Sequence, residues 1–268
     1  MIVARDVASL RAALGGERWA LAPTMGALHA GHMALVAEAR RHAPRVAASI
    51  FVNPTQFAAG EDLSRYPRDE AGDLALLEAA GCDLAWLPTV EVMYPPGDAT
   101  TVTVGGPSEE FEGAIRPGHF RGMATVVAKL LHQVSPAAVM FGEKDWQQLQ
   151  VVRRMMADLH WPIEVVAVPT VREPDGLAMS SRNRFLAPEH RVVAARLFAV
   201  LQTTAARAGE PHALADAEAA LREAGLDVDY LALVEAASLQ PTTIPRGARL
   251  IAAARLGPVR LLDNVPVA

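Results

Sequence analysis

The chain has 268 residues, a length that suits one large α/β domain or a large and a small domain sharing a cleft. Its 51% hydrophobic and 21% charged residues are typical of an ordered globular protein and exclude disorder as the main state. With 25 basic and 30 acidic residues the net charge is −5, which argues against nucleic acid as a partner. The one cysteine, Cys82, cannot form an internal disulfide, so we expect a fold held by burial in a reducing compartment.

Nothing in the sequence predicts secretion or membrane insertion. Residues 1–14 include Arg5, Asp6 and Arg11, which interrupt the apolar core that a signal peptide requires. The longest apolar windows, such as 46–52, fall far short of the roughly 18 residues needed to cross a bilayer. We therefore expect a cytoplasmic protein with no membrane partner.

From residue 19 to residue 168, apolar runs alternate with amphipathic stretches, a pattern typical of βαβ units and a parallel sheet. Strands are predicted at 19–23, 46–52, 82–87, 137–141 and 163–168. Helices are predicted from about residue 31 and at 68–80, 123–134 and 146–159. Residues 105–120 are rich in Gly, Pro and charge, so we expect a long loop there, close to the functional site.

The last third of the sequence begins with a polar, turn-rich segment from Pro169 and predicts a second, smaller domain. Two Ala-rich helices are expected at 188–208 and 212–224, followed by strands at 227–234, 249–256 and 259–262. The boundary is placed within 170–174, which gives domains of 1–172 and 173–268.

The strongest single signal is the stretch Pro23-Thr-Met-Gly-Ala-Leu-His-Ala-Gly-His32, where a buried strand gives way to a helix. Ligands of open α/β sheets bind at the carboxyl ends of strands, and a helix N-terminus favours phosphate. Gly26 and Gly31 allow close approach of the backbone, and His29 and His32 could donate to one polyphosphate. The two histidines could equally cap the helix; a zinc site is a poorer interpretation, because no cysteine or third ligand accompanies them.

A second cluster, Phe51-Val-Asn-Pro-Thr-Gln-Phe57, follows the next strand, so Asn53 and Gln56 should face the same cleft. Amide side chains both donate and accept, which suits recognition of hydroxyl and carboxylate groups. The alternative is an Asn-Pro turn with a surface glutamine.

A third cluster, Phe141-Gly-Glu-Lys-Asp-Trp-Gln-Gln148, also stands where a strand enters a helix. Lys144 is one of two lysines in a chain that otherwise uses arginine, and its compact ammonium suits charge neutralisation on a phosphoryl group. Asp145 could instead be no more than a helix cap.

Two further segments add cations and hydroxyls. Ser180 and Ser181 stand beside Arg182 in the segment Asp175-Gly-Leu-Ala-Met-Ser-Ser-Arg-Asn183, at the proposed domain junction. Two hydroxyls and a guanidinium suit the binding of pyrophosphate, and a hinge position would let the segment close over it. Arg116-Pro-Gly-His-Phe120 contributes another guanidinium and the imidazole of His119. Each could also be an ordinary exposed polar loop.

The His-x-Gly-His turn and the Met-Ser-Ser-Arg segment resemble the two ATP-binding signatures of the nucleotidylyl transferase superfamily. The full set of motifs, in this order and spacing from about Pro23 to Leu186, closely resembles the pantothenate synthetase (pantoate-beta-alanine ligase) family. That resemblance implies an α/β fold: a Rossmann-like parallel sheet domain with a smaller α+β C-terminal lid domain. It also implies a homodimer and the condensation of (R)-pantoate with beta-alanine, driven by ATP with Mg²⁺, through a pantoyl-adenylate.

The same resemblance implies the site residues. ATP would be bound by Met25, Gly26, Ala27, Leu28, His29, Ala30, Gly31, His32, Gly142, Glu143, Lys144, Asp145, Val171, Met179, Ser180, Ser181 and Arg182. Pantoate would be bound by Gln56 and Gln148, with Asn53 and His119 assigned to the same substrate site. His29, His32, Lys144, Ser180, Ser181 and Arg182 are predicted to be catalytic. No residue is predicted to ligate a metal, because Mg²⁺ could be held largely by the phosphates.

Two rival functions remain open at this stage. Another adenylate-forming enzyme of the same superfamily would share the ATP signatures, and a nucleotide-binding sensor would need the phosphate-binding residues but not the Asn53–Gln56 amides. An aminoacyl-tRNA synthetase is disfavoured, because the chain is acidic and too short for an anticodon-binding region.

Overall fold

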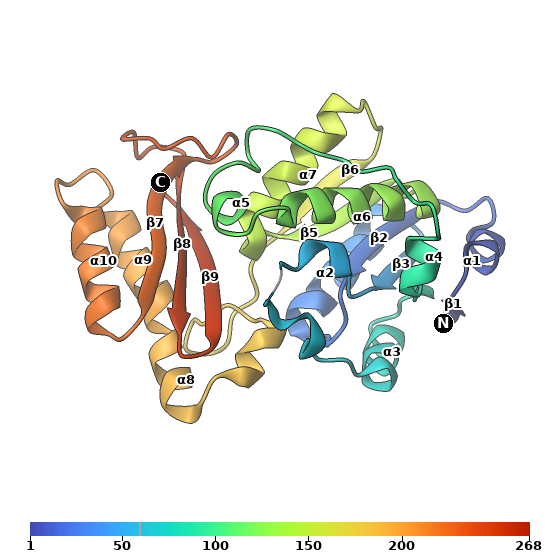
Figure 1. The fold of residues 1–268 in the computed structure, drawn as a ribbon, viewed down its shortest axis with the longest axis horizontal. Helices are drawn as coiled ribbons and strands as arrows, with labels where there is room; N and C mark the ends of the chain where they lie inside the picture. Colours follow the sequence, from blue (N-terminus) through green and yellow to red (C-terminus); the bar gives the residue numbers. More distant parts are fainter. Residues whose placement is uncertain (59) are drawn as a thin grey trace. The chain divides into compact units, whose positions relative to one another are not determined.

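The computed structural model describes residues 1–58 and 60–268. The chain divides into two compact units. The first unit comprises residues 1–143 and 147–169, and the second comprises 144–146 and 170–268. Each unit has its own sheet (Figure 1). Each unit also has its own hydrophobic core.

The first unit is built on a six-stranded sheet in the order β1-β4-β3-β2-β5-β6. Its strands are β1 (Ile2–Ala4), β2 (Trp19–Thr24), β3 (Arg45–Ile50), β4 (Leu84–Trp86), β5 (Ala138–Gly142) and β6 (Glu164–Val168). All paired strands run parallel, in agreement with the predicted fold class. The central strands are almost wholly apolar because both faces of a parallel sheet are covered by helices.

The order of these strands determines where a ligand can bind. The chain runs from β2 outward through β3 and β4, and then returns to place β5 on the other side of β2. The strand order therefore reverses between β2 and β5, and a crevice opens outside the carboxyl ends of strands at such a switch point. The residues after Thr24 and after Gly142 lie at this point.

Helices cover both faces of the larger sheet. They are α1 (Val7–Leu14), α2 (Ala30–His42), α3 (Glu70–Ala79), α4 (Val90–Met93), α5 (Glu112–Ile115), α6 (His119–Val134) and α7 (Trp146–Asp158). On one face Leu35 and Val36 of α2 pack against Ala20 and Ala22 of β2, where small residues let the helix approach closely. Helix α6 contacts β2 and α1, and ten of its residues are buried.

The second unit is a three-stranded antiparallel sheet with helices packed on it (Figure 1). The strands β7 (Asp227–Glu235), β8 (Ala248–Leu256) and β9 (Val259–Pro266) are neighbours in that order. Helices α8 (Pro188–Ala194), α9 (Arg196–Ala206) and α10 (Ala213–Glu223) supply Leu197, Leu201 and Leu221 to the core of this unit. Among the described residues, no helix combines the length and apolar character needed to span a bilayer.

The structure departs from the predicted elements in several places. The strand β1 and the helices α1 and α4 were not predicted, because segments of three to eight residues carry too little periodicity. The predicted loop 105–120 contains α5 and the first residues of α6. The single helix predicted at 188–208 is two helices, which meet at Ala195.

Candidate functional site

The turn after β2 is shaped by two residues with left-handed backbone. The Thr24 hydroxyl donates to the Ser49 carbonyl (2.6 Å) and accepts the N–H of Gly26 (3.3 Å). Gly26 (φ 84°) and Ala27 (φ 52°) then turn the chain out of the strand. The chain thus passes from the sheet edge into α2, a helix of 13 residues whose N-terminus provides positive potential.

His29 and His32 are held together at the start of α2. His29 is the N-cap, and its Nδ1 accepts the N–H of Gly31 (3.1 Å). The His29 N–H in turn donates to Nδ1 of His32 (3.3 Å), and the ring centroids are 4.1 Å apart. Because each Nδ1 accepts, each neutral ring carries its proton on Nε2, the nitrogen that can donate to an anionic oxygen. Capping and phosphate recognition are therefore compatible functions of the same two side chains.

Asn53 organises the second cluster, which follows β3. Its side chain is 1% exposed and donates to Gln56 Oε1 and to the Gly122 carbonyl, both at 3.1 Å. Its Oδ1 accepts from Thr55 and, at 2.8 Å, from the Tyr94 hydroxyl. The Asn53 amide is thus engaged within the protein, and it fixes the side chain of Gln56, whose Nε2 lies 3.1 Å from the sulfur of Met25.

Gly122 explains why α6 can come so near this cluster. A Cβ atom at position 122 would lie 2.1 Å from the Thr55 carbonyl oxygen, an impossible distance. Only glycine permits this contact between α6 and the 3₁₀ turn Pro54–Gln56.

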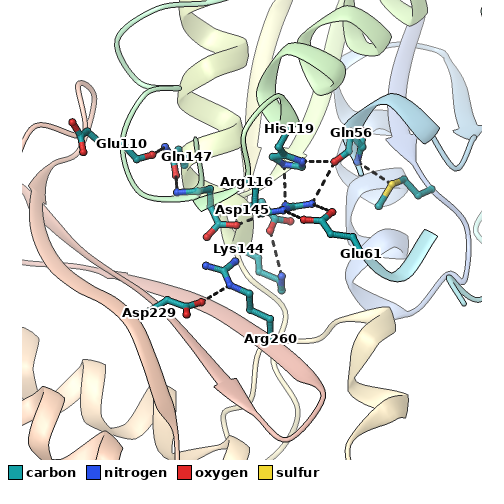
Figure 2. Close-up of polar contacts among 12 residues, drawn as sticks. Gln56, Glu61, Glu110, Arg116, His119, Lys144, Asp145, Gln147, Asp229 and Arg260 are labelled. Atoms are coloured by element: carbon teal, nitrogen blue, oxygen red, sulfur yellow. Dashed lines mark hydrogen bonds and ion pairs between the residues drawn. The ribbon is translucent and has the colours of Figure 1, made fainter. Parts of the chain in front are cut away.

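His119 and Arg116 hold the backbone of Gln56 (Figure 2). His119 Nδ1 is 2.8 Å from the Gln56 carbonyl and its Nε2 is 3.2 Å from Nη1 of Arg116. Burial, followed by the charge of Arg116, lowers the pKa of His119 to about 4, so the neutral ring donates from Nδ1 and accepts at Nε2. Arg116 also forms a two-pronged ion pair with Glu61 at 2.7 and 2.9 Å. Burial opposes ionisation of Glu61, but the Arg116 contacts prevail and its pKa is lowered.

Two adjacent glutamines at the start of α7 have different surroundings. Gln147 is buried; its amide donates to the carbonyls of Pro107 (2.9 Å) and Glu110 (2.7 Å) and accepts the N–H of Glu112 (3.0 Å). It thereby fixes the segment that precedes α5 (Figure 2). Gln148 is half-buried, and its amide makes no hydrogen bond within the part of the chain that the structure describes. Gln148 is the one whose amide is available to a ligand.

Lys144 belongs to the second unit, and side chains of that unit hold its backbone. The Lys144 carbonyl accepts from Asn264 Nδ2 (2.9 Å), and Asn264 Oδ1 accepts from Nε of Arg249 (2.5 Å). The Arg249 guanidinium stacks 3.5 Å from the ring centroid of Trp146, whose indole N–H donates to the Ala236 carbonyl (2.7 Å). The Lys144 ammonium lies 3.3 Å from Asp145 Oδ1.

The Met-Ser-Ser-Arg segment is also anchored in the second unit. The N–H of Met179 donates to the Val171 carbonyl (3.0 Å), closing a short hairpin. Within that hairpin Arg172 pairs with Asp263 at 2.6 and 2.9 Å. Ser180 caps the 3₁₀ helix Ser181–Phe185 by accepting the N–H of Arg182. The hydroxyls and the guanidinium are therefore presented on a fixed backbone.

Sequence reasoning missed three buried polar residues that support these segments. Asp73 of α3 accepts backbone N–H groups of the turn after β2, Gln147 holds the segment before α5, and Asn264 holds Lys144. A signal existed only for Asn264, since asparagine occurs at just three positions of this sequence. For Asp73 and Gln147 no local pattern marks the contact.

The strand order, the histidine pair at a helix N-terminus and the adjacent amides define a Rossmann-like α/β protein suited to an anionic ligand at the switch point. Comparison with known proteins extends this assignment. The profile described as Pantoate-beta-alanine ligase matches residues 2–266. The chain therefore belongs to the pantoate-beta-alanine ligase family.

Individual relatives agree along the full length. A pantothenate synthetase of Acidiphilium cryptum is 60% identical, with all of both chains covered. The crystal structure of pantothenate synthetase from Thermus thermophilus has a TM-score of 0.96 at 53% identity, covering 100% of this chain and 99% of that one. The pantoate-beta-alanine ligase of Francisella tularensis, solved in complex with beta-gamma ATP and beta-alanine, has a TM-score of 0.86 at 30% identity, covering 99% and 97%.

Proposed function

We propose that the residues after β2, β3 and β5, together with two segments of the second unit, catalyse the reaction of this ligase family. As a family member, the chain condenses (R)-pantoate with beta-alanine at the expense of ATP. The pantoate carboxylate attacks the α-phosphorus of ATP, which releases pyrophosphate and leaves pantoyl-adenylate. The amine of beta-alanine then attacks the acyl carbon and displaces AMP, giving pantothenate.

The phosphate-directed turn at the switch point is the observation that carries this proposal. The turn ends in a histidine pair whose Nδ1 atoms are occupied by backbone N–H groups, so that both Nε2–H groups can donate. We assign the ATP-binding role to 25–32, 142–145, Val171 and 179–182, as the family motifs imply.

The chemistry requires charge neutralisation and alignment more than a covalent nucleophile. A carboxylate that attacks a triphosphate brings two anions together, so preorganised donors lower the barrier most. In our proposal His29, His32 and Lys144 stabilise the charge on the α-phosphate and on the leaving pyrophosphate. Ser180, Ser181 and Arg182 bind the β- and γ-phosphates.

For pantoate we propose direct contacts from Gln56 and Gln148. The Gln56 side chain is fixed by Asn53 and its backbone by His119, as the distances above show. Asn53 and His119, which we also assign to the substrate site, would then act on pantoate through Gln56. This arrangement keeps the amide donors rigid, so little conformational freedom is lost when pantoate binds.

Magnesium is part of the proposal as a companion of ATP. Among the described residues, no group of three His, Cys, Asp or Glu side chains is placed to hold a metal ion. Oxygen atoms of the triphosphate are donors that fit this hard cation. When bound there, Mg²⁺ would neutralise phosphate charge.

Wider predictions about the domains, the assembly and the location accompany the assignment. Residues 1–172 would form the domain that binds ATP and pantoate, and residues 173–268 the lid. We also propose a cytoplasmic homodimer that takes these small molecules as substrates and binds no nucleic acid.

The test is product analysis of the purified chain with ATP, Mg²⁺, pantoate and beta-alanine, with each acid omitted in turn. We expect AMP and pantothenate only in the complete mixture. Formation of ADP would indicate γ-phosphoryl transfer and overturn the mechanism. ATP binding without turnover would favour a sensor or a different acceptor.

A further inference from the structure

Asp73 is a buried acid that the reaction scheme above does not use. It lies on α3, is 3% exposed, and reaches the turn after β2, 46 residues earlier in the chain. Its Oδ2 accepts the N–H of Ala27 (2.8 Å) and its Oδ1 accepts the N–H of Leu28 (2.7 Å). Both oxygens of one carboxylate thus bind successive backbone amides just before His29.

These two amides need such a partner. Successive N–H groups in a turn with left-handed residues point the same way and form a concave site that favours an anion. Here the anion is a side chain of the protein itself. The N–H groups of Ala27 and Leu28 are therefore directed to Asp73, and any contact of these residues with ATP must come from other atoms.

The fit around the carboxylate is tight. A Cβ atom on Gly26 would lie 2.9 Å from Oδ2 of Asp73, and the positive φ of Gly26 disfavours any side chain there. The glycine and the acid are consequently complementary: the absence of a side chain at 26 makes room for the carboxylate that holds 27 and 28.

We propose that Asp73 is the positioning residue for the histidine pair: its carboxylate fixes the turn so that His29 and His32 face the ATP phosphates. The chain of contacts is continuous, from Asp73 to the N–H groups of Ala27 and Leu28, then to His29 and through its N–H to His32. The inference rests on the proposed function, since it assumes that the histidines act on ATP. The carboxylate itself touches no substrate.

The first test replaces Asp73 by asparagine, which keeps the shape but offers one acceptor in place of two. One amide then faces an NH₂ group, and the turn must shift. We expect the kcat for AMP formation to fall about 10²-fold, the effect of a misplacement of about 1 Å, while the KM for pantoate stays within about twofold of the wild type, as for a lost transition-state interaction.

The matched control is Asp69→Asn. Asp69 is the N-cap of the same helix and accepts the N–H of Gly72 (3.1 Å), and asparagine caps as well as aspartate does. The control changes the charge of α3 by the same amount and should keep kcat within about twofold. Equal losses in both variants would overturn the proposal, because they would reflect charge or helix stability alone. Unchanged kcat in Asp73→Asn would overturn it as well.

Gly26→Ala provides a second route to the same displacement, should Asp73→Asn fail to fold. The added methyl pushes the carboxylate away while its charge remains. We expect a similar loss of kcat, and a double variant no worse than the poorer single one, because both changes break the same contact. Additive losses would show that the two residues act independently and would contradict the inference.

A readout that does not depend on turnover separates this inference from the proposed function. Nitrogen-15 spectra of the imidazoles, with ATP absent, should show His29 and His32 as Nε2–H tautomers in the wild type and as a mixture in Asp73→Asn. If the wild type forms no AMP but the tautomers respond, the reaction is wrong and the positioning role stands. If AMP forms but the tautomers do not respond to Asp73→Asn, the positioning role is wrong.

Discussion

Two segments are proposed to contact ATP, one in each unit. The first is held by a side chain that accepts hydrogen bonds, and the second by a side chain that donates one. The turn 26–28 of the first unit is held by the buried carboxylate of Asp73. Lys144 of the second unit is held by the buried amide of Asn264, which is bound to the stacked cation Arg249. Asn264 and Arg249 are 4% and 7% exposed, so these are interior groups and not surface contacts.

The difference follows from which backbone group lacks a partner. In the turn, two successive N–H groups require an acceptor, whereas at Lys144 a carbonyl requires a donor. An unsatisfied buried backbone group destabilises the fold by about 1–3 kcal/mol, so each site recruits the side chain that matches it. The polarity of the supporting residue is thus determined by the backbone and not by the charge of the ligand.

The largest effect is expected for Lys144, the residue whose backbone carbonyl is held by Asn264. Lys144→Ala removes the ammonium while the Asn264 contact to the backbone carbonyl is retained, so the fold should persist. Loss of one preorganised donor should slow adenylate formation about 10²–10³-fold. Rapid-quench measurement of adenylate from ATP and pantoate tests this, with Arg207→Ala as the control, because the exposed Arg207 pairs with Glu210 of the same unit. Near-normal adenylate formation would exclude the proposed role.

A smaller effect is expected for the pantoate-binding amides. Gln56→Ala and Gln148→Ala should each weaken pantoate binding about 10–100-fold and leave ATP binding nearly unchanged, since a buried hydrogen-bond partner is lost on one ligand only. Titration calorimetry with each ligand separately gives both affinities. Gln133→Ala is a suitable control, since Gln133 of α6 binds Trp86 instead. Equal weakening of ATP and pantoate would contradict the assignment.

Asn264→Asp sharpens the comparison between the units. The change keeps an acceptor for Arg249 and places a second oxygen against the Lys144 carbonyl in place of the donor. We expect about 1–3 kcal/mol lower stability and a kcat about tenfold lower, because the Lys144 backbone shifts. Urea unfolding and steady-state kinetics give the two values, with the exposed Thr203→Ala of α9 as the control. A stability loss with unchanged kcat would mean that Asn264 serves the fold alone.

The smallest effect is a pH dependence that originates at His119. Its folded pKa of about 4 lies below the ordinary value of 6.5, so below pH 6.5 the unfolded chain binds a proton that the folded chain does not. The contribution of His119 to the free energy of unfolding is therefore nearly constant well above pH 6.5, and it destabilises the protein as the pH falls toward 4. Between pH 7.5 and pH 5 the loss of stability should amount to about 1–2 kcal/mol, because the His119 ring is partly exposed and solvent screens its charge.

The measurement is the free energy of unfolding in urea at both pH values for the wild type and His119→Asn. The difference between the two proteins isolates this residue, because His42 and other groups titrate in both. The lower limit of pH 5 also stays above the ordinary pKa of Glu61, which is 4.5. The pKa of Glu61 is lowered in the folded protein, so the stability that this carboxylate adds is lost only below that limit. An identical pH dependence in both proteins would show that His119 is not the origin.

The sequence by itself determined most of the elements and the residues at their ends. Runs such as 19–23 and 137–141 match β2 and β5 closely, because buried parallel strands are continuous apolar runs bounded by turn residues. The motif at Pro23–His32 also marked a strand end and a helix start, where local geometry is encoded in neighbouring residues.

Only the tertiary structure decided how those ends are supported. Asp73 reaches a turn 46 residues away, and Asn264 reaches Lys144 over 120 residues. Helix and strand periodicity extends over a few residues, so it carries no information about such pairs. The strand order also places β5 beside β2 and thereby brings Gly142 to the turn after Thr24. These contacts arise when distant segments pack, because each buried backbone group then needs a partner that its own neighbours in the sequence do not provide.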